Sequence, residues 1–322
     1  MPSLTLPYTP HRVLVGASAH EEVAAWIRTR RPHLDVRNRA HTEITADDLH
    51  WAEAYVGFRR PPAATTMGSV RWIHSTGAGV DAWLSAGLDP HILLTRSSES
   101  FGPMIAEWVV ARVFAVQLQL LELATAQRAH QWAPRDVPRV AGTRALVVGT
   151  GDIGTSVATS LHALGCHVTG VSRSGIARDD HTSSVFRAIH PVRALPELVG
   201  DADWIVLTIP DTPASRGLIS RSVLARCRGA LLLNAGRGSV IEESALPEAL
   251  DQGWLRGAAL DVFAEEPLPT ASPLWDDPRV LVSPHISGRT TVQGAASGFV
   301  ACLDELETGS WPVWVVNHSK GY

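Results

Sequence analysis

The sequence predicts an α/β fold with two doubly wound parallel-sheet domains. Short apolar runs alternate with helix-like stretches along the chain, as in repeated βα units. Most of these runs lack polar alternation, which is typical of strands that helices cover on both faces of a parallel sheet. The length of 322 residues is sufficient for about two domains of roughly 150 residues each.

The first part of the chain is predicted to contain four strands and two helices. Periodic apolar patterns predict a helix over 21–29 and one long helix over 102–128. The expected strands cover residues 13–15, 54–57, 70–74 and 92–95.

The strand pattern restarts after a polar, proline-containing connection at 132–140. Two more helices are predicted, over 153–164 and 290–307, and the tail at 311–316 is expected to be a strand that packs on the N-terminal lobe. Six further strands are expected at residues 144–148, 166–171, 204–209, 230–234, 257–260 and 280–283.

Composition and charge exclude several classes of protein. With 45% hydrophobic residues, 19% charged residues and a net charge of −4, the chain is predicted to be globular and to lack a broad basic surface for nucleic acid. No uninterrupted apolar stretch reaches the ~20 residues of a membrane span, and the N-terminus has no basic start with a sustained apolar region. We therefore expect a cytoplasmic protein without a membrane or nucleic-acid partner.

The cysteines and histidines give no sign of a metal or disulfide site. Cys166, Cys227 and Cys302 are odd in number and far apart, as expected of reduced core thiols. No CxxC or HExxH motif occurs, and the histidines have no metal-ligand spacing. We predict no metal.

A glycine-rich turn follows the strand expected at 144–148 and precedes a helical stretch. The first glycine permits the tight turn, the second lets the backbone approach a pyrophosphate, and the third permits close helix packing, while the helix N-terminus offers N–H groups to the anion. The alternative is a glycine turn that binds nothing. The residues of this glycine loop are Gly149, Thr150, Gly151, Asp152, Ile153 and Gly154.

The end of the next strand indicates which dinucleotide binds. Where a cofactor without a 2′-phosphate usually meets an Asp or Glu, the sequence has Ser172, Arg173 and Ser174. A guanidinium and two hydroxyl donors favour NADP(H) as the cofactor. NAD(H) remains possible, because the alternative is that Arg173 is a surface residue stacked on adenine.

Three charged residues follow later strand ends. Arg237, Glu266 and His285 lie beyond the strands at 230–234, 257–260 and 280–283, and such loops converge on one ligand crevice. Reduction of a 2-keto acid needs an Arg to bind the anion, a protonated His to protonate the carbonyl oxygen, and a carboxylate to orient the imidazole and stabilise its charged form. Taken singly, they have ordinary alternatives: a surface charge, a turn cap and a buried histidine that holds a loop.

The chain resembles the D-isomer-specific 2-hydroxyacid dehydrogenase family from about residue 72 to the tail. The Trp72 to Asp81 stretch, the Ser-Arg-Ser run at 172–174 and the Glu-Pro-Leu-Pro run at 266–269 look most like its glyoxylate/hydroxypyruvate reductase branch. The motifs that carry the resemblance occur in order: Ser75-Thr-Gly-Ala-Gly-Val-Asp81, Ala106-Glu-Trp108, the glycine loop, Pro210-Asp-Thr-Pro213, Arg216-Gly-Leu-Ile219 and the segments containing Arg237, Glu266 and His285.

The resemblance implies a role for each matched residue. Arg237 is implied to bind the substrate, Glu266 to support the histidine and His285 to be the acid/base. Backbone N–H groups of Ala78 and Gly79 are implied to receive the substrate carboxylate. The implied cofactor contacts beyond the glycine loop and the Ser-Arg-Ser run are Ile209, Pro210, Ala235, Gly236, Arg237, Asp261 at the nicotinamide carboxamide, His285 and Gly288.

Two positions depart from the family pattern without removing a catalytic group. Ser287 stands where a small apolar residue is usual, and Thr150 replaces a bulky apolar residue in the glycine loop. A hydroxyl near the carbonyl site is expected to favour a polar substituent, such as the hydroxymethyl group of hydroxypyruvate.

The whole pattern predicts a Rossmann cofactor domain at 104–287, inserted into a flavodoxin-like substrate domain at 1–103 and 288–322, with the active site in the cleft and a homodimer as the assembly. The predicted reaction is NADPH-dependent reduction of a small 2-keto acid, such as glyoxylate or hydroxypyruvate, to the D-2-hydroxy acid. The alternatives are an NAD-dependent D-2-hydroxyacid or phosphite dehydrogenase, and a dinucleotide-sensing regulatory protein of the same fold.

Overall fold

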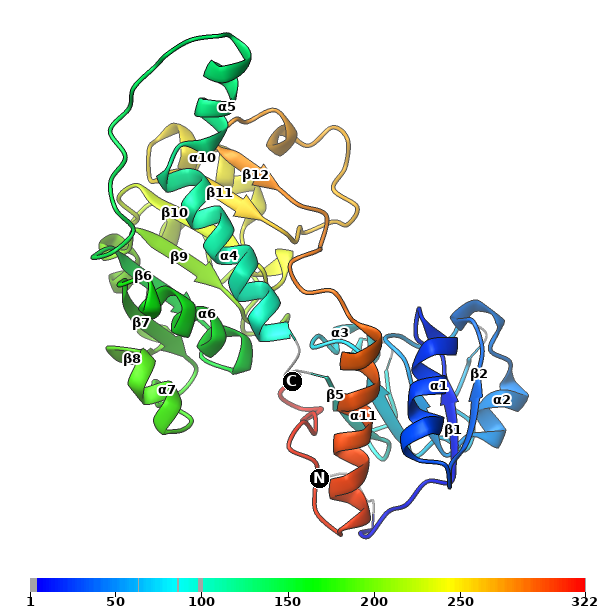
Figure 1. Ribbon diagram of the computed structural model, residues 1–322. Helices are drawn as coiled ribbons and strands as arrows, with labels where there is room; N and C mark the ends of the chain where they lie inside the picture. The colour runs from blue at the N-terminus through cyan, green and yellow to red at the C-terminus, as the bar shows by residue number, and fades with distance from the viewer. Residues whose placement is uncertain (1–4, 63, 86, 98–100, 322) are drawn as a thin grey trace. The chain divides into compact units, whose positions relative to one another are not determined.

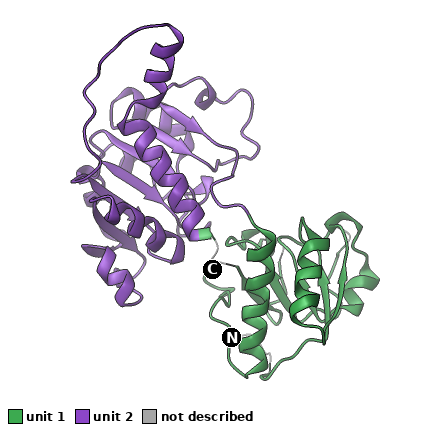
Figure 2. Cartoon of the chain, in the orientation of Figure 1, with its two compact units in different colours: residues 1–101, 290–322 green, residues 102–289 purple. Residues whose placement is uncertain are grey.

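The computed structural model describes residues 5–62, 64–85, 87–97 and 101–321. The chain divides into two compact units (Figure 2). Unit 1 contains residues 1–101 and 290–322, and unit 2 contains residues 102–289. Each unit is built on one parallel sheet with helices against it, so the predicted α/β class is confirmed (Figure 1).

Unit 1 has a five-stranded sheet in the order β2-β1-β3-β4-β5, which is the flavodoxin-like order. All neighbouring strands in it are parallel. Its elements are β1 Arg12–Val15, α1 His20–Arg30, β2 Asp35–Asn38, α2 Ala46–Trp51, β3 Ala54–Val56, β4 Trp72–Ser75, α3 Asp81–Leu84, β5 Leu93–Arg96 and α11 Val292–Glu307.

Successive strand residues point to opposite sides of this sheet, and here they are apolar on both sides. Val13 and Val15 pack on one side with α1 and α11, and Leu14 packs on the other with α2 and α3. Trp72 packs on the same side as Val13, and Ile73 packs on the same side as Leu14. The uninterrupted apolar runs in the sequence therefore correspond to strands buried on both faces.

Unit 2 has a seven-stranded parallel sheet in the order β12-β11-β10-β9-β6-β7-β8, the doubly wound arrangement of a Rossmann domain with one more strand at its edge. Its elements are α4 Phe101–Gln117, α5 Leu120–Arg128, β6 Arg144–Val148, α6 Asp152–Ala163, β7 His167–Ser172, α7 Asp180–Val185, β8 Ala188–Pro191, α8 Leu195–Leu198, β9 Trp204–Leu207, α9 Arg221–Leu224, β10 Ala230–Asn234, α10 Leu246–Asp251, β11 Leu255–Leu260 and β12 Val280–Val282.

The predicted single helix over 102–128 is wrong. Gln119 has left-handed backbone angles (φ 52°), and the chain bends by 57° between α4 and α5. The apolar periodicity continues across this break, so the sequence pattern alone does not reveal it. Within the described ranges, no single helix is long and apolar enough to cross a membrane, although α4 and α5 together pass that test by length and composition.

Three other expectations need correction. Strands β2 and β8 were not predicted, because their sequences DVRN and AIHP are too polar to resemble buried strands. The tail at 311–316 is not a strand: it makes one bridge from Val315 to Thr95, and Pro312 lies in a turn. The tail does pack on unit 1, where Val316 is buried and donates its N–H to the carbonyl of Leu94.

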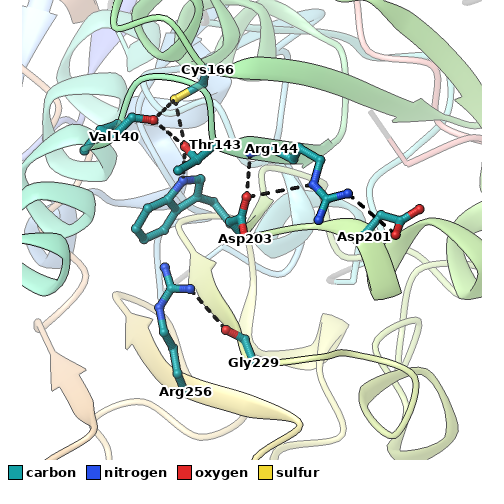
Figure 3. A network of polar contacts seen from close by, with 9 residues as sticks. Val140, Thr143, Arg144, Cys166, Asp201, Asp203, Gly229 and Arg256 are labelled. Carbon is teal, nitrogen blue, oxygen red and sulfur yellow. Dashed lines mark hydrogen bonds and ion pairs between the residues drawn. The ribbon is translucent and has the colours of Figure 1, made fainter. Parts of the chain in front are cut away.

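The amino edge of the unit 2 sheet carries a network of polar contacts (Figure 3). The Thr143 hydroxyl donates to the carbonyl of Val140 (2.6 Å) and accepts from the indole N–H of Trp204 (2.7 Å). The Arg256 guanidinium lies 4.4 Å from the centroid of the Trp204 ring and donates to the carbonyl of Gly229. These contacts join the amino ends of β6, β9 and β11, at the opposite edge from the loops described next.

Candidate active site

His285 and Glu266 form a close pair in the loops that follow β12 and β11. One ring nitrogen of His285 contacts the carboxylate: Nδ1 lies 2.7 Å from Oε2 of Glu266. Oε1 of Glu266 accepts a hydrogen bond from the backbone N–H of Phe263 at 3.0 Å, which fixes the carboxylate. Both side chains are half-exposed. The arrangement holds the imidazole by Nδ1, and Nε2 makes no hydrogen bond with the residues that the structure describes.

The buried carboxylate of Asp261 holds the backbone on both sides of His285. Its Oδ1 accepts from the Ser283 hydroxyl (2.5 Å) and from the N–H of Ile286 (3.0 Å), and its Oδ2 accepts from the N–H of Ser287 (2.8 Å). His285 has a φ of 53°, and its N–H donates to the carbonyl of Asp261. Asp261 thus fixes the loop that orients the histidine, and its implied contact with the nicotinamide stays a prediction.

Arg237 lies at the same carboxyl edge of the sheet, immediately after β10. The Asn234 side chain braces this turn: its Nδ2 donates to the carbonyl of Arg237 and its Oδ1 accepts from the N–H of Gly236. Nη1 of the partly buried Arg237 donates to the carbonyl of Gly236 at 2.8 Å.

Glycines allow the neighbouring loops to pack closely here. A Cβ atom on Gly236 would lie 2.8 Å from the carbonyl oxygen of Ile209, in the loop after β9, and one on Gly238 would lie 1.8 Å from the carbonyl carbon of Phe263. The loops after β9, β10 and β11 are therefore in contact, which brings the segments of Ile209, Ala235 and Glu266 to one edge. Ala235 is buried, Pro210 and Gly288 are partly buried, and Pro210 accepts from the Ser215 hydroxyl (2.6 Å).

The glycine loop joins the end of β6 to the first turn of α6. Gly149 has a φ of 105°, and a Cβ on Gly154 would lie 1.8 Å from the carbonyl oxygen of Gly149, so α6 packs directly on the turn. A Cβ on Gly151 would meet no atom within 4 Å, so the backbone there faces open space. Gly151 is also the N-cap of α6 and has no side chain to cap the first N–H groups. These features fit an anion bound at the helix N-terminus.

Thr150, which departs from the family pattern, packs closely on the neighbouring strand. The buried Thr150 packs on Gly170 of β7, where a Cβ would lie 2.8 Å from the Thr150 methyl group. Ile153 is partly buried in the first turn of α6.

The segment after β7 contains a second guanidinium near the glycine loop, that of Arg178. Ser172 and Ser174 accept from the backbone N–H groups of Gly175 and Ile176, which shapes the turn around the exposed Arg173. The residue that sequence reasoning missed is Arg178, whose Nη1 lies 2.5 Å from Oδ1 of Asp152 in the glycine loop. No spacing rule marks this pair, because strand β7 separates the two residues.

In unit 1, Ala78 and Gly79 lie in the loop that links β4 to α3, and both are partly buried. We call residues 75–80 the carboxylate loop. Its backbone carbonyls are held by side chains from three directions: Ser75, Arg96 and Thr290. Sequence reasoning missed Arg96 and Thr290 because they are distant in the chain from the loop they contact.

An open cavity of about 390 Å³ lies beside the segment that follows His285. Arg112 in its wall stacks over the Trp108 ring at 4.5 Å, and burial lowers the pKa of this guanidinium while the charge of Asp261 opposes that change. Trp108 donates its indole N–H to the hydroxyl of Ser283, so α4 also supports the Asp261 contacts. The lining residues are Met104, Glu107, Trp108, Ala111, Arg112, Ile286, Ser287 and Arg289.

The described residues include no group of three or more His, Cys, Asp or Glu side chains placed to hold a metal ion. The three cysteines are all free and buried. Burial raises the pKa of the Cys227 thiol to about 11.

Comparisons with known proteins show which family the chain resembles. Residues 110–287 match the model of the D-isomer specific 2-hydroxyacid dehydrogenase, NAD binding domain. A glyoxylate/hydroxypyruvate reductase A of Serratia proteamaculans is 32% identical over 276 residues, which is 82% of this chain and 86% of that protein.

Solved structures of similar proteins cover almost the whole chain. A D-isomer specific 2-hydroxyacid dehydrogenase of Xanthobacter autotrophicus, in complex with NADPH and MES, has a TM-score of 0.85 and 29% identity and covers 98% of this chain and 100% of that one. The NADPH-dependent glyoxylate/hydroxypyruvate reductase of Sinorhizobium meliloti, in complex with NADP and sulfate, has a TM-score of 0.83 and 28% identity, with 97% and 99% covered. The chain therefore belongs to the D-isomer specific 2-hydroxyacid dehydrogenase family of NAD(P)-dependent oxidoreductases.

Proposed function

We propose that the protein reduces a small 2-keto acid, such as glyoxylate or hydroxypyruvate, to the D-2-hydroxy acid with NADPH. The observation that carries this proposal is the His285–Glu266 pair, which holds a proton donor at the carboxyl edge of a dinucleotide-binding sheet. The names of the Serratia and Sinorhizobium relatives support the substrate class.

The proton transfer uses groups of this chain. Because Nδ1 of His285 is bound to Glu266, Nε2 is the nitrogen that donates a proton to the carbonyl oxygen. Glu266 stabilises the imidazolium before that transfer, and a proton from solvent restores it afterwards. A reduced nicotinamide, when bound, supplies the hydride that adds to the carbonyl carbon. Arg237 binds the substrate anion, and the N–H groups of Ala78 and Gly79 receive its carboxylate.

The site residues fit NADP(H). We propose that the glycine loop holds the pyrophosphate and that Arg173, with the hydroxyls of Ser172 and Ser174, binds the 2′-phosphate. Asp261, Ile209, Pro210, Ala235, Gly236 and Gly288 are the proposed contacts on the nicotinamide side. The two solved relatives that contain NADPH or NADP support this preference.

The assembly we propose is a homodimer, formed by α5 and the connection after it. Large apolar side chains are exposed in this segment and would be covered by a second copy. They are Leu120, Leu121, Leu123, Trp132 and Val137. A cytoplasmic location is proposed with it.

Steady-state kinetics test the reaction. Purified protein is expected to oxidise NADPH with glyoxylate or hydroxypyruvate, and His285→Asn is expected to lower kcat about 10²- to 10⁴-fold, since a positioned general acid contributes that much. His167→Asn, at the exposed amino end of β7, is the matched control and is expected to keep full activity. Turnover absent from the wild-type protein, or retained in His285→Asn, would contradict the proposal.

Affinity measurements test the cofactor. Arg173→Ala is expected to weaken NADPH binding by about 1–3 kcal/mol, the range of hydrogen bonds to charged groups, and to leave NADH binding nearly unchanged. Arg187→Ala, at an exposed position beside β8, is the control. Equal losses for the two cofactors would remove the argument for the 2′-phosphate.

A further inference from the structure

The carboxylate loop has three successive peptide carbonyls engaged by side chains. The Thr290 hydroxyl donates to the carbonyl of Thr76 (3.2 Å), and the Ser75 hydroxyl donates to the carbonyl of Gly77 (3.3 Å). Nη1 of Arg96 donates to the carbonyl of Ala78 at 2.9 Å, which is the shortest of the three contacts and the only charged one. The strongest constraint on this loop is therefore the guanidinium of Arg96.

The direction of the N–H groups follows from these contacts. In a trans peptide the C=O and the next N–H point to opposite sides, so the N–H groups of Gly77, Ala78 and Gly79 point away from the side chains that hold the loop. Within the described part of the chain, none of these three N–H groups donates a hydrogen bond. Three successive N–H donors without an internal acceptor are available to bind an anion.

Arg96 also changes the strength of one donor. A cationic hydrogen bond to the carbonyl of Ala78 polarises the peptide group that contains the N–H of Gly79. That N–H becomes a better donor to a carboxylate, and the guanidinium charge lies behind it. Arg96 thus acts on an anion through the backbone.

The position of Arg96 is fixed by a buried network on both sides of it in β5. Nδ1 of His74 lies 2.9 Å from the hydroxyl of Thr95, and Nε2 lies 3.0 Å from the hydroxyl of Ser97. The backbone N–H of Arg96 donates to the carbonyl of Trp314. The backbone from which the Arg96 side chain extends is therefore held in place on both sides.

We propose that Arg96 is a positioning residue for substrate binding: it holds the carbonyl of Ala78 so that the N–H of Gly79 faces the substrate carboxylate in a polarised state. Thr290, five residues after His285, holds the preceding part of the same loop. This inference rests on the proposed function, in which the loop receives the carboxylate of a 2-keto acid.

Kinetics of Arg96→Met test the proposal. Loss of one charge-assisted contact is expected to raise the KM for glyoxylate about tenfold or more, with kcat and the KM for NADPH within about twofold of wild type. Arg96→Lys keeps the charge without the planar fork and is expected to recover part of the affinity. Arg71→Met is the matched control, because Arg71 lies at the amino end of β4, over the Tyr8 ring, and is expected to leave the KM unchanged.

A binding measurement supplies a readout independent of turnover. In protein labelled with ¹⁵N-glycine, the Gly79 amide resonance is expected to shift when oxamate, an unreactive 2-keto acid analogue, is added to the NADP⁺-loaded protein. The shift should require a much higher oxamate concentration in Arg96→Met and be unchanged in Arg71→Met. Melting temperatures close to wild type would show that the variant is folded.

The two measurements separate the inference from the proposed function. A wild-type protein that reduces 2-keto acids without a shift of the Gly79 amide, or an Arg96→Met variant with the wild-type KM and shift, overturns the role of Arg96. So does a variant that loses kcat, NADPH affinity and thermal stability together. A wild-type protein that shows the Arg96-dependent shift without turnover retains the inference and rejects the proposed reaction, and one that shows neither rejects both.

Discussion

The side chain of His74 is fully buried and neutral. Burial lowers its pKa to about 3, and the groups around it are the hydroxyls of Thr95 and Ser97 and the rings of Trp72 and Phe299, none of which carries a charge. A Cβ on Gly298 of α11 would lie 3.1 Å from its Nε2, so the space around the ring is closed. The folded core therefore strongly disfavours the protonated form of His74.

Acid should destabilise the protein through this residue. In the unfolded chain His74 binds a proton below about pH 6.5, whereas in the native protein it binds one only near pH 3. Between these two pH values the unfolded state binds more protons than the native state. The free energy of unfolding therefore falls as the pH falls through this window, by about 1 kcal/mol per pH unit. Urea unfolding at about pH 7 and about pH 5 measures it. His74→Gln is expected to show a smaller loss between these two pH values, and an identical loss would contradict the assignment.

At the residue scale, the places after strand ends together with the family resemblance predicted that Glu266 and His285 lie close together, but not which residues support them. Glu266 and His285 are marked by their places after strand ends, and the structure joins them at 2.7 Å. Asn234 and Ser283, which hold the flanking turns, look like ordinary polar residues in the sequence. Their roles depend on contacts between separate loops, which no local pattern records.

At the scale of elements, two glycines of the glycine loop have different roles. Gly154 lies against the carbonyl of Gly149, so it is needed for the packing of α6. Gly151 faces open space, so it is needed only when something binds there. The sequence motif predicts both positions, but only the structure distinguishes them.

Alanine substitutions at these two glycines are expected to have different effects on stability and on NADPH binding. Gly151→Ala should change the free energy of unfolding by no more than about 1 kcal/mol, the scale of an N-cap effect, while raising the Kd for NADPH at least about tenfold. Gly154→Ala should lose about 1–3 kcal/mol of stability, because the added methyl group displaces the helix. Urea unfolding and fluorescence titration measure the two effects. NADPH affinity of Gly151→Ala equal to wild type would contradict the assignment of the loop.

Elements with strong apolar runs were predictable, and polar or bent ones were not. The strand at Ala230–Asn234 is buried at every position, whereas β2 and β8 contain exposed and partly exposed residues and were missed. The break at Gln119 was missed because left-handed geometry at a non-glycine residue leaves no signature in composition.

At the scale of the whole molecule, the exposed apolar side chains of α5 and of the connection after it favour an interface with a second copy of the chain. Trp132 is 98% exposed and Leu121 is 50% exposed, which is costly for side chains of this size in water. The wild-type protein is therefore expected to sediment at twice its 34.6 kDa chain mass. Leu121→Gln is expected to shift the equilibrium toward the monomer, and Ile176→Gln, a single exposed apolar residue elsewhere, serves as control. A wild-type monomer at micromolar concentration would refute the homodimer.

The two edges of the unit 2 sheet divide the properties of the protein between them. The contacts of Thr143, Trp204 and Arg256 tie the amino ends of its strands, and the unit 2 residues proposed to bind the cofactor or to transfer the proton lie at or after the carboxyl ends. Heat resistance can for this reason be adjusted at the amino edge, by an engineer or by natural selection, without a change in the loops proposed to bind cofactor and substrate. A library confined to the amino edge would yield hardier variants of unchanged selectivity.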